Sequence, residues 1–516
     1  MPRHRPHPPV PVLLAALFIP LAAQEVSSPA ASITAAEIRR HVYYLASDAL
    51  EGRYMASKGY EIAARYGESQ FKAAGLKPPV LADGKPGYLQ PVPVQRRTCT
   101  KEPVLTIATP KGSLRLEQPK DFKWLDGDIL PCQDRTLEVV FAGFGIREPA
   151  AGWNDFKGLD TEGKLVIIWP NAPLRKGKPV LPEAVHKTYL QAGGFQKKLM
   201  SLLSLKAAGV LLVTDPALAA MIDKSKPKSA SPQIVYANSK APAFIPWIVT
   251  VKPETVLAMM AGQAGGLKKA GEAEAAKVRP AALKGVTATV DVSFDSEALP
   301  SWNVVGMVEG TDPVLKAEYV AVTAHLDHLN PDSKGDIRNG ADDNASGSAA
   351  VMEIAEAVAR RPFKRSVVFV LFAGEESGLL GSRHFLAECP VPRDKIVADL
   401  TLDMIARTDR ASESDRAHYA LDTDTITPEF KKLLIAVNER TVRWPLKFER
   451  IGGAGSDNMT FANFGIPGVF FFSGSHIDYH RATDDADKLD YEKAEALTRL
   501  TYELAAELGE KPLPWR

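Results

Sequence analysis

The C-terminal half of the chain alternates uninterrupted apolar stretches with helical patterns, and this alternation limits the possible fold most strongly. Strand-like apolar runs occur at 318–323, 366–372, 397–402 and 469–472. Between the first two, residues 346–359 repeat apolar side chains at helical spacing. Strands that are apolar on both sides need a covering layer on each face. The pattern therefore predicts an α/β fold with a mixed, mostly parallel sheet and helices on both faces.

The rest of the chain adds two further regions. Thr34 and Glu37 form a capping-box pattern before a first helix, and a second helix is expected at 59–74. Further along, strand-like runs alternate with an amphipathic helix between residues 137 and 213. This mixture predicts a small inserted domain that is β-rich and of the α+β class.

Charge and the first residues indicate compartment and partners. The 63 Lys and Arg nearly cancel the 62 Asp and Glu, so no net field favours nucleic acid. Arg3 and Arg5 precede an apolar run at 10–23, which predicts a signal peptide over residues 1–24. That run is shorter than the ~20 residues of a spanning helix. We expect a secreted or periplasmic protein without an integral membrane segment after signal removal.

Three cysteines are too few for a disulfide scaffold. In an oxidising compartment Cys99 and Cys132 have the option of pairing, which would leave Cys389 free, but three unpaired thiols fit the sequence equally well.

Polar side chains gather where the predicted strands end. In open α/β sheets, ligands bind beyond the carboxyl ends of the strands. Acidic and imidazole residues follow the apolar runs there, or open the helix behind one: His325, Asp327, His328, Asp342, Asp343, Glu375, Glu376, Asp403, His476 and His480. Each short motif alone is more typical of a surface pair or a helix cap. Their common position favours one site.

Such a cluster of carboxylates needs positive charge within it. Two imidazoles with three carboxylates suit Zn²⁺, with Mn²⁺ or Co²⁺ as possible substitutes. Five ligands are too many for one tetrahedral ion, but they fit two ions that share a bridging carboxylate.

Local spacing assigns further roles. In extended chain, residues i and i+2 face the same side, so His325 and Asp327 are expected together and His328 is expected to point away. Adjacent glutamates cannot both face one ion, so one of Glu375 and Glu376 would bind metal. The other would stay free beside the attacking water as a general base.

At these residues the chain resembles zinc-dependent peptidases of family M28, in the subgroup with a protease-associated (PA) domain insertion. The motifs are Ala324–His328, Gly340–Gly347, Gly374–Ser382, Leu402–Ile405 and Asp478–Asp485. Segment 47–53, the end of the second helix, and the strands at 139–146 and 163–168 add to the resemblance.

The resemblance implies a role for each matching residue. Asp343 would bridge two Zn²⁺ ions, with Asp342 as its rival. His325 and Asp403 would complete one site, Glu376 and His480 the other, and His476 is the rival of His480. Glu375 would be the general base and Asp327 would orient His325. Tyr479, Arg407 and Asn458 are candidate substrate-binding residues. The family often has His where Asn458 stands, which leaves pocket contacts open.

The resemblance also implies domains and an activity. The peptidase domain would take 30–130 and 290–516, the PA insertion 131–260, and a connection 261–289. The expected reaction is removal of N-terminal residues from a peptide substrate. A carboxypeptidase or dipeptidase of the glutamate carboxypeptidase type is the alternative. A glutaminyl cyclase and a non-catalytic, receptor-like relative are more remote. The sequence leaves the oligomeric state open.

Overall fold

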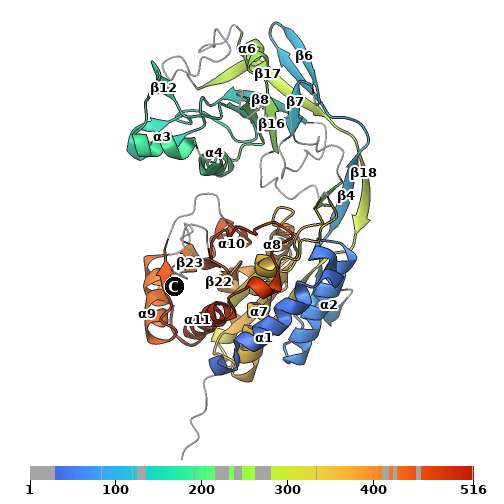
Figure 1. Ribbon diagram of the computed structural model, residues 1–516, viewed down its shortest axis with the longest axis vertical. Helices are drawn as coiled ribbons and strands as arrows, with labels where there is room; N and C mark the ends of the chain where they lie inside the picture. The colour runs from blue at the N-terminus through green and yellow to red at the C-terminus, as the bar shows by residue number, and fades with distance from the viewer. Residues whose placement is uncertain are drawn as a thin grey trace, which may run out of the picture.

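The computed structural model describes residues 29–515 apart from residues 83, 119, 125–134, 191, 215–231, 238–246, 262–279, 333, 409–417, 422–426, 449–454 and 514. The described residues form two lobes, and strands β4 and β18 run between them along one side of the molecule (Figure 1). The expected signal peptide and Cys132 lie outside the described residues, so the pairing of Cys99 with Cys132 stays a prediction.

The first lobe is built on an eight-stranded sheet in the order β24-β23-β25-β22-β20-β21-β19-β3. Its central strands pair in parallel, β20 with β21 and β22, and β22 with β25. Antiparallel strands flank this centre. The predicted mixed, mostly parallel sheet is therefore confirmed. The strands are β3 (Leu89–Pro91), β19 (Trp302–Val308), β20 (Tyr319–His325), β21 (Ser366–Phe372), β22 (Ile396–Leu402), β23 (His418–Leu421), β24 (Leu446–Lys447) and β25 (Gly468–Phe472).

Helices cover both faces of this sheet. One face packs on α1, α2, α7, α9 and α11, and alternate residues such as Val320 and Val322 of β20 point into that core. The other face packs on α8 and α10, with Phe372 of β21 among Phe385 and Phe461. The helices are α1 (Ala35–Leu45), α2 (Lys58–Ala73), α7 (Gly347–Arg360), α8 (Leu380–Ala387), α9 (Pro428–Arg440), α10 (Asn458–Asn463) and α11 (Tyr491–Glu510). Among the described helices, none combines the length and apolar character needed to cross a bilayer.

The second lobe has an eight-stranded sheet of its own, in the order β6-β5-β17-β8-β11-β14-β16-β7. Helices α3 and α6 pack on one face and α4 on the other. Its elements are β5 (Val104–Thr109), β6 (Gly112–Glu117), β7 (Phe122–Trp124), β8 (Arg135–Phe141), β11 (Leu165–Ile168), α3 (Glu183–Tyr189), α4 (Ala192–Ser204), β14 (Gly209–Val213), β16 (Trp247–Val251), α6 (Pro253–Met260) and β17 (Ala281–Asp291).

A three-stranded sheet, β15-β4-β18, joins the lobes. It contains β4 (Val94–Cys99), β15 (Gln233–Tyr236) and β18 (Phe294–Leu299). The remaining strands form two-stranded hairpins: β1 (Val80–Ala82) with β2 (Lys85–Gly87), β9 (Arg147–Glu148) with β10 (Trp153–Asn154), and β12 (Leu174–Arg175) with β13 (Lys178–Pro179).

The second lobe extends beyond the range 131–260 expected for the insertion. Strands β5, β6 and β7 precede residue 131, and β17 falls largely within the expected connection at 261–289. β17 pairs with both β5 and β8 and buries Val286, Ala288 and Val290 on one side. The alanines, threonines and lysine of β17 resemble the composition of a loose linker, so composition did not indicate a strand. The alternation of Val286, Ala288 and Val290 with less apolar residues was the available sequence signal for one.

Candidate active site

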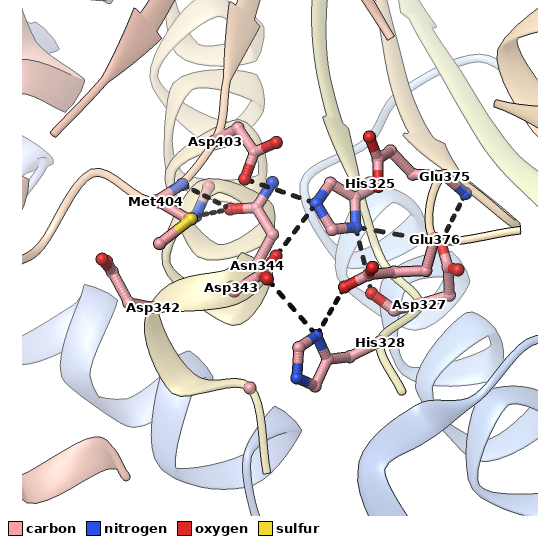
Figure 2. A network of polar contacts seen from close by, with 12 residues as sticks. His325, Asp327, His328, Asp342, Asp343, Asn344, Glu375, Glu376, Asp403 and Met404 are labelled. Carbon is pink, nitrogen blue, oxygen red and sulfur yellow. Dashed lines mark hydrogen bonds and ion pairs between the residues drawn. The ribbon is translucent and has the colours of Figure 1, made fainter. Parts of the chain in front are cut away.

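Three neighbouring strands, β20, β21 and β22, deliver polar residues to one edge of the first sheet. β20 ends at His325, which is level with Phe372 at the end of β21 in the parallel register. Glu375 and Glu376 follow β21, and Asp403 follows β22. Because parallel strands all end at the same edge, residues that are far apart in sequence meet there (Figure 2).

The first cluster centres on the buried imidazole of His325. Its Nε2 atom lies 3.3 Å from Oδ1 of Asp343 and 3.3 Å from Oδ1 of Asp403. Asp343 is 3 % exposed and Asp403 7 %. The three residues can hold one metal ion between them.

The second cluster uses the other oxygen of Asp343. Nε2 of His480 lies 3.2 Å from Oδ2 of Asp343 and 3.3 Å from Oε2 of Glu376. Asp343 therefore faces His325 with one carboxylate oxygen and His480 with the other. This is the arrangement that a carboxylate bridging two cations requires.

The rival residues form a separate pair. Oδ1 of Asp342 accepts a hydrogen bond from Ala406 N at 2.7 Å, and its carboxylate points away from the two clusters (Figure 2). Nε2 of His476 lies 3.4 Å from Oδ2 of Asp342. The geometry thus separates Asp342 and His476 from Asp343 and His480.

The donor set fits two divalent cations of the size of Zn²⁺. Zinc ligands lie about 2.0–2.1 Å from the metal, so tetrahedral ligand atoms are about 3.3 Å apart. The four distances from His325 and His480 match this separation and exceed the usual length of a charged hydrogen bond. Oδ2 of Asp343 and Oδ1 of Asp403 are also buried without a hydrogen-bonding partner among the described residues. Buried anionic oxygens in this state call for a counter-ion.

The pKa values of two carboxyl groups in the pocket, those of Asp343 and Glu375, shift in opposite directions. Burial would raise the pKa of Asp343, but the imidazoles of His328, His325 and His480 hold it well below its usual range. Burial, together with Glu376 and Asp403, raises the pKa of Glu375 well above its usual range. Cations at the two clusters would oppose this effect on Glu375. Asp343 is thus suited to bind a cation and Glu375 to hold a proton.

Asp327 contacts both His325 and the backbone of Glu375. It was expected to orient His325, and the atom closest to that imidazole is its backbone carbonyl oxygen. Nδ1 of His325 lies 3.0 Å from the backbone carbonyl oxygen of Asp327 and 3.8 Å from its carboxylate. The carboxylate oxygen Oδ1 accepts a hydrogen bond from the backbone N–H of Glu375 at 3.1 Å. Burial raises the pKa of Asp327 to about 7. Its main chain therefore orients His325, while its side chain fixes the loop that carries Glu375.

The prediction that His328 points away from the site is wrong. Its Nδ1 atom lies 2.8 Å from Oε1 of Glu376 and 3.6 Å from Oδ2 of Asp343, and its ring is fully buried (Figure 2). The expectation extended strand alternation beyond the end of the strand. β20 stops at His325, so the alternation of faces no longer applies three residues later.

Arg53 is a residue that the functional assignments from sequence missed. Its guanidinium is fully buried and donates hydrogen bonds to the carbonyl oxygens of Leu326, Asn339, Gly340 and Leu45. One of these, Leu326, lies between His325 and Asp327, and two, Asn339 and Gly340, lie just before Asp343 in sequence. The resemblance of segment 47–53 to the family signature was the available signal.

The candidate substrate-binding residues differ in accessibility. Tyr479 is 39 % exposed, and its ring centroid lies 3.8 Å from that of His480. Arg407 donates to Oδ2 of Asp478 at 3.0 Å, so its charge is already paired. Asn458 is buried at the start of α10, and its Oδ1 accepts from the backbone N–H of Ser456.

Fold and site together define an α/β protein with a candidate two-cation centre at the carboxyl edge of its sheet. Residues 303–505 match the model of peptidase family M28. The match contains most of the first-lobe sheet and all the residues of the two clusters.

Individual relatives agree with the family. The chain is 30 % identical over 219 residues to leupeptin-inactivating enzyme 1 of Streptomyces exfoliatus, covering 42 % of this chain and 45 % of that protein. It is 27 % identical over 218 residues to a probable leucine aminopeptidase of Trichophyton verrucosum, covering 40 % and 57 %. The chain thus spans about half the length of these curated relatives.

A match that spans both lobes is the structure of an aminopeptidase from Aneurinibacillus sp. strain AM-1, with a TM-score of 0.51 and 21 % identity. The match covers 94 % of this chain and 95 % of that one. At this identity the likeness shows the shared fold.

Proposed function

We propose that the protein is an exported, zinc-dependent aminopeptidase that removes N-terminal residues from peptides. The observation that carries the proposal is the carboxylate of Asp343, which faces His325 with one oxygen and His480 with the other. The match of residues 303–505 to the family model and the aminopeptidase named among the relatives support the reaction class. The predicted signal sequence supports a secreted or periplasmic location.

In this proposal the two clusters would each hold a Zn²⁺ ion. His325 and Asp403 would hold one, Glu376 and His480 would hold the other, and Asp343 would contribute to both. When bound, the cations would polarise the scissile carbonyl and lower the pKa of the attacking water. Mn²⁺ and Co²⁺ accept the same nitrogen and oxygen ligands and are possible substitutes.

Glu375 performs the proton transfers. Its backbone is held by the carboxylate of Asp327, and its own carboxylate binds neither imidazole of the clusters. It accepts a proton from the attacking water and then donates it to the leaving amine. Tyr479 lies at the exposed rim beside His480, where a substrate side chain would pass.

The carboxypeptidase alternative needs a basic side chain that is free to bind a terminal carboxylate. Arg407, the candidate for that role, is paired with Asp478, which also faces Lys488 at 3.6 Å. No described contact favours this alternative. The pocket also keeps its full ligand set and Glu375, as a catalyst rather than a receptor-like relative requires.

We further propose that the second lobe, from β5 to β17, is the PA domain. The chain enters this lobe after β4 and leaves it before β18, so the lobe is inserted within the peptidase sequence. The match of both lobes to one aminopeptidase structure supports this organisation. In this position it would limit access of large substrates to the site.

The central test replaces Glu375 by Gln, which keeps the shape but removes the base. We expect hydrolysis of aminoacyl-nitroanilides to fall about 10²–10⁴-fold, with two zinc ions still bound by metal analysis. Glu388→Gln, an exposed glutamate in the same segment, is the matched control and should retain activity. Amino-blocked dipeptides should resist cleavage, and a chelator should abolish hydrolysis of the aminoacyl-nitroanilides. Full activity of Glu375→Gln would remove this residue from the mechanism.

A further inference from the structure

His328 is a buried imidazole beside the second cluster to which neither the motifs nor the proposed reaction assigns a role. Its side chain is fully buried, and Nδ1 faces Glu376. Glu376 therefore has an imidazole on each carboxylate oxygen, with His328 near Oε1 and His480 near Oε2.

The two imidazoles lie at different distances from the carboxylate oxygens of Glu376. This difference indicates which imidazole is a metal ligand and which is a hydrogen-bond donor. His480 lies 3.3 Å from Oε2 of Glu376, which matches the ~3.3 Å between two ligands of one zinc ion. His328 lies 2.8 Å from Oε1, the length of a charge-assisted hydrogen bond. Its distance to Oδ2 of Asp343 is longer, at 3.6 Å. His328, Asp343 and Glu376 are close enough together to hold a metal ion. The short distance from His328 to Glu376 nevertheless favours a donor role for His328, and the ~3.3 Å spacing favours a ligand role for His480.

The protonation of the ring follows from its partner. A carboxylate that binds a cation is ionised and can only accept hydrogen bonds, so Nδ1 of His328 must carry the hydrogen. A protonated ring nitrogen has no lone pair for a metal. The other nitrogen, Nε2, is buried without a hydrogen-bonding partner among the described residues.

The ring is held in place by the loop that leads to Asp343. A Cβ atom at Gly340 would lie 2.5 Å from two ring carbons of His328, so only glycine leaves room for it there. Gly340 also has a left-handed backbone, with φ +57°, and its carbonyl accepts from Arg53. The ring of His328 meets that of His480 edge to face, with centroids 5.8 Å apart.

We propose that His328 is a positioning residue for the second cation: its Nδ1–H bond to Oε1 turns Oε2 of Glu376 towards the metal and His480. The inference rests on the proposed two-cation centre. Hydrogen bonds of this kind to a metal ligand usually contribute about 10–100-fold to metal affinity. Loss of the donor should therefore weaken the second cation and leave the first, at His325 and Asp403, almost unchanged.

Two substitutions distinguish a donor from a ligand. Asn places an amide N–H where Nδ1 of histidine lies and is a poor zinc ligand, whereas Leu has similar bulk and no donor. For the chelated protein titrated with Co²⁺, we expect His328→Leu to weaken the second binding step about 10–100-fold. His328→Asn should stay within about threefold of wild type in the same step, because it restores the hydrogen bond. Calorimetry and the visible absorption of bound Co²⁺ report both steps without any need for turnover.

The controls make each outcome decisive. His186→Leu removes a buried imidazole from α3 in the other lobe and should leave both steps unchanged. His480→Leu removes a proposed ligand and should abolish the second step. If His328→Asn binds as weakly as His328→Leu, His328 is a ligand and the positioning role is wrong. If His328→Leu binds like wild type, His328 has no role at the metal. Wild-type protein that takes up fewer than two Co²⁺ ions would contradict the proposed centre itself.

Discussion

Replacing Arg53 by Met would test how the fold supports the pocket. The guanidinium donates to four carbonyl oxygens at 2.6–3.0 Å, three of them in buried bonds and one in a partly buried bond, and none of these bonds goes to a carboxylate. Taking about 1 kcal/mol for each acceptor left without a donor, the lower end of the range for buried groups, gives a loss of about 4 kcal/mol. That is a large share of a typical stability of ~5–15 kcal/mol. Arg53→Lys keeps the charge but has one nitrogen, which can reach about half of the acceptors, so about 2 kcal/mol should be lost.

Urea unfolding of the chelated proteins, followed by circular dichroism, measures these losses. The exposed Arg39, which donates to the Tyr43 hydroxyl, provides the control, and Arg39→Met should change stability by less than about 0.5 kcal/mol. The activity of Arg53→Lys at saturating zinc should also fall, because two of the carbonyls belong to the loop before Asp343. If Arg53→Met lies within about 1 kcal/mol of wild type, or Arg53→Lys retains both stability and activity, the positioning role of Arg53 is refuted.

Three further substitutions test two separate parts of the structure. Burial raises the pKa of Asp399 to about 7 from 3.8. Its folded form thus keeps a proton that the unfolded chain releases, and stability should fall from about pH 4 to about pH 7. Asp399→Asn should remove at most ~4 kcal/mol of that fall, so urea midpoints that match wild type at pH 7.5 would contradict this reasoning. His480→Leu should lose one of two bound zinc ions by metal analysis, whereas His476→Leu, whose imidazole faces Asp342 instead, should keep both; the reverse result would exchange the assignments.

Strand positions and the polar residues behind them were predictable because both follow from local pattern. The run 366–372 coincides with β21, and the other C-terminal runs agree with their strands within two residues. The predicted N-cap also formed, since Oγ1 of Thr34 accepts from the backbone N–H of Glu37. Parallel strands that end at one edge then bring His325, Glu376 and Asp403 together without further information.

The contacts that depend on loops were not predictable. His328 turned inwards because the chain leaves the strand at His325, and no local period describes the path after that point. The four acceptors of Arg53 are backbone carbonyls, which every sequence contains, so nothing in the residue types marked them. The breadth of the second lobe was hidden for a related reason. The partners of β17 are distant in sequence, and its own composition is weakly apolar.

The acidic charge of the pocket makes cations and protons compete for the same side chains. Arg53 is a buried positive group close to the acidic residues, but all the hydrogen bonds described for it go to carbonyl oxygens, so it does not pair with Asp343, Glu376 or Asp403. The positive charge that balances these carboxylates therefore comes from protonated imidazoles. Although burial lowers the pKa of His480, contacts with Asp343 and Glu376 raise it to about 10. A cation that binds between these residues must displace that proton, because the same nitrogen cannot hold both. Metal affinity should therefore increase with pH, because the acidic residues proposed to bind the cations also make the pocket retain protons in their place.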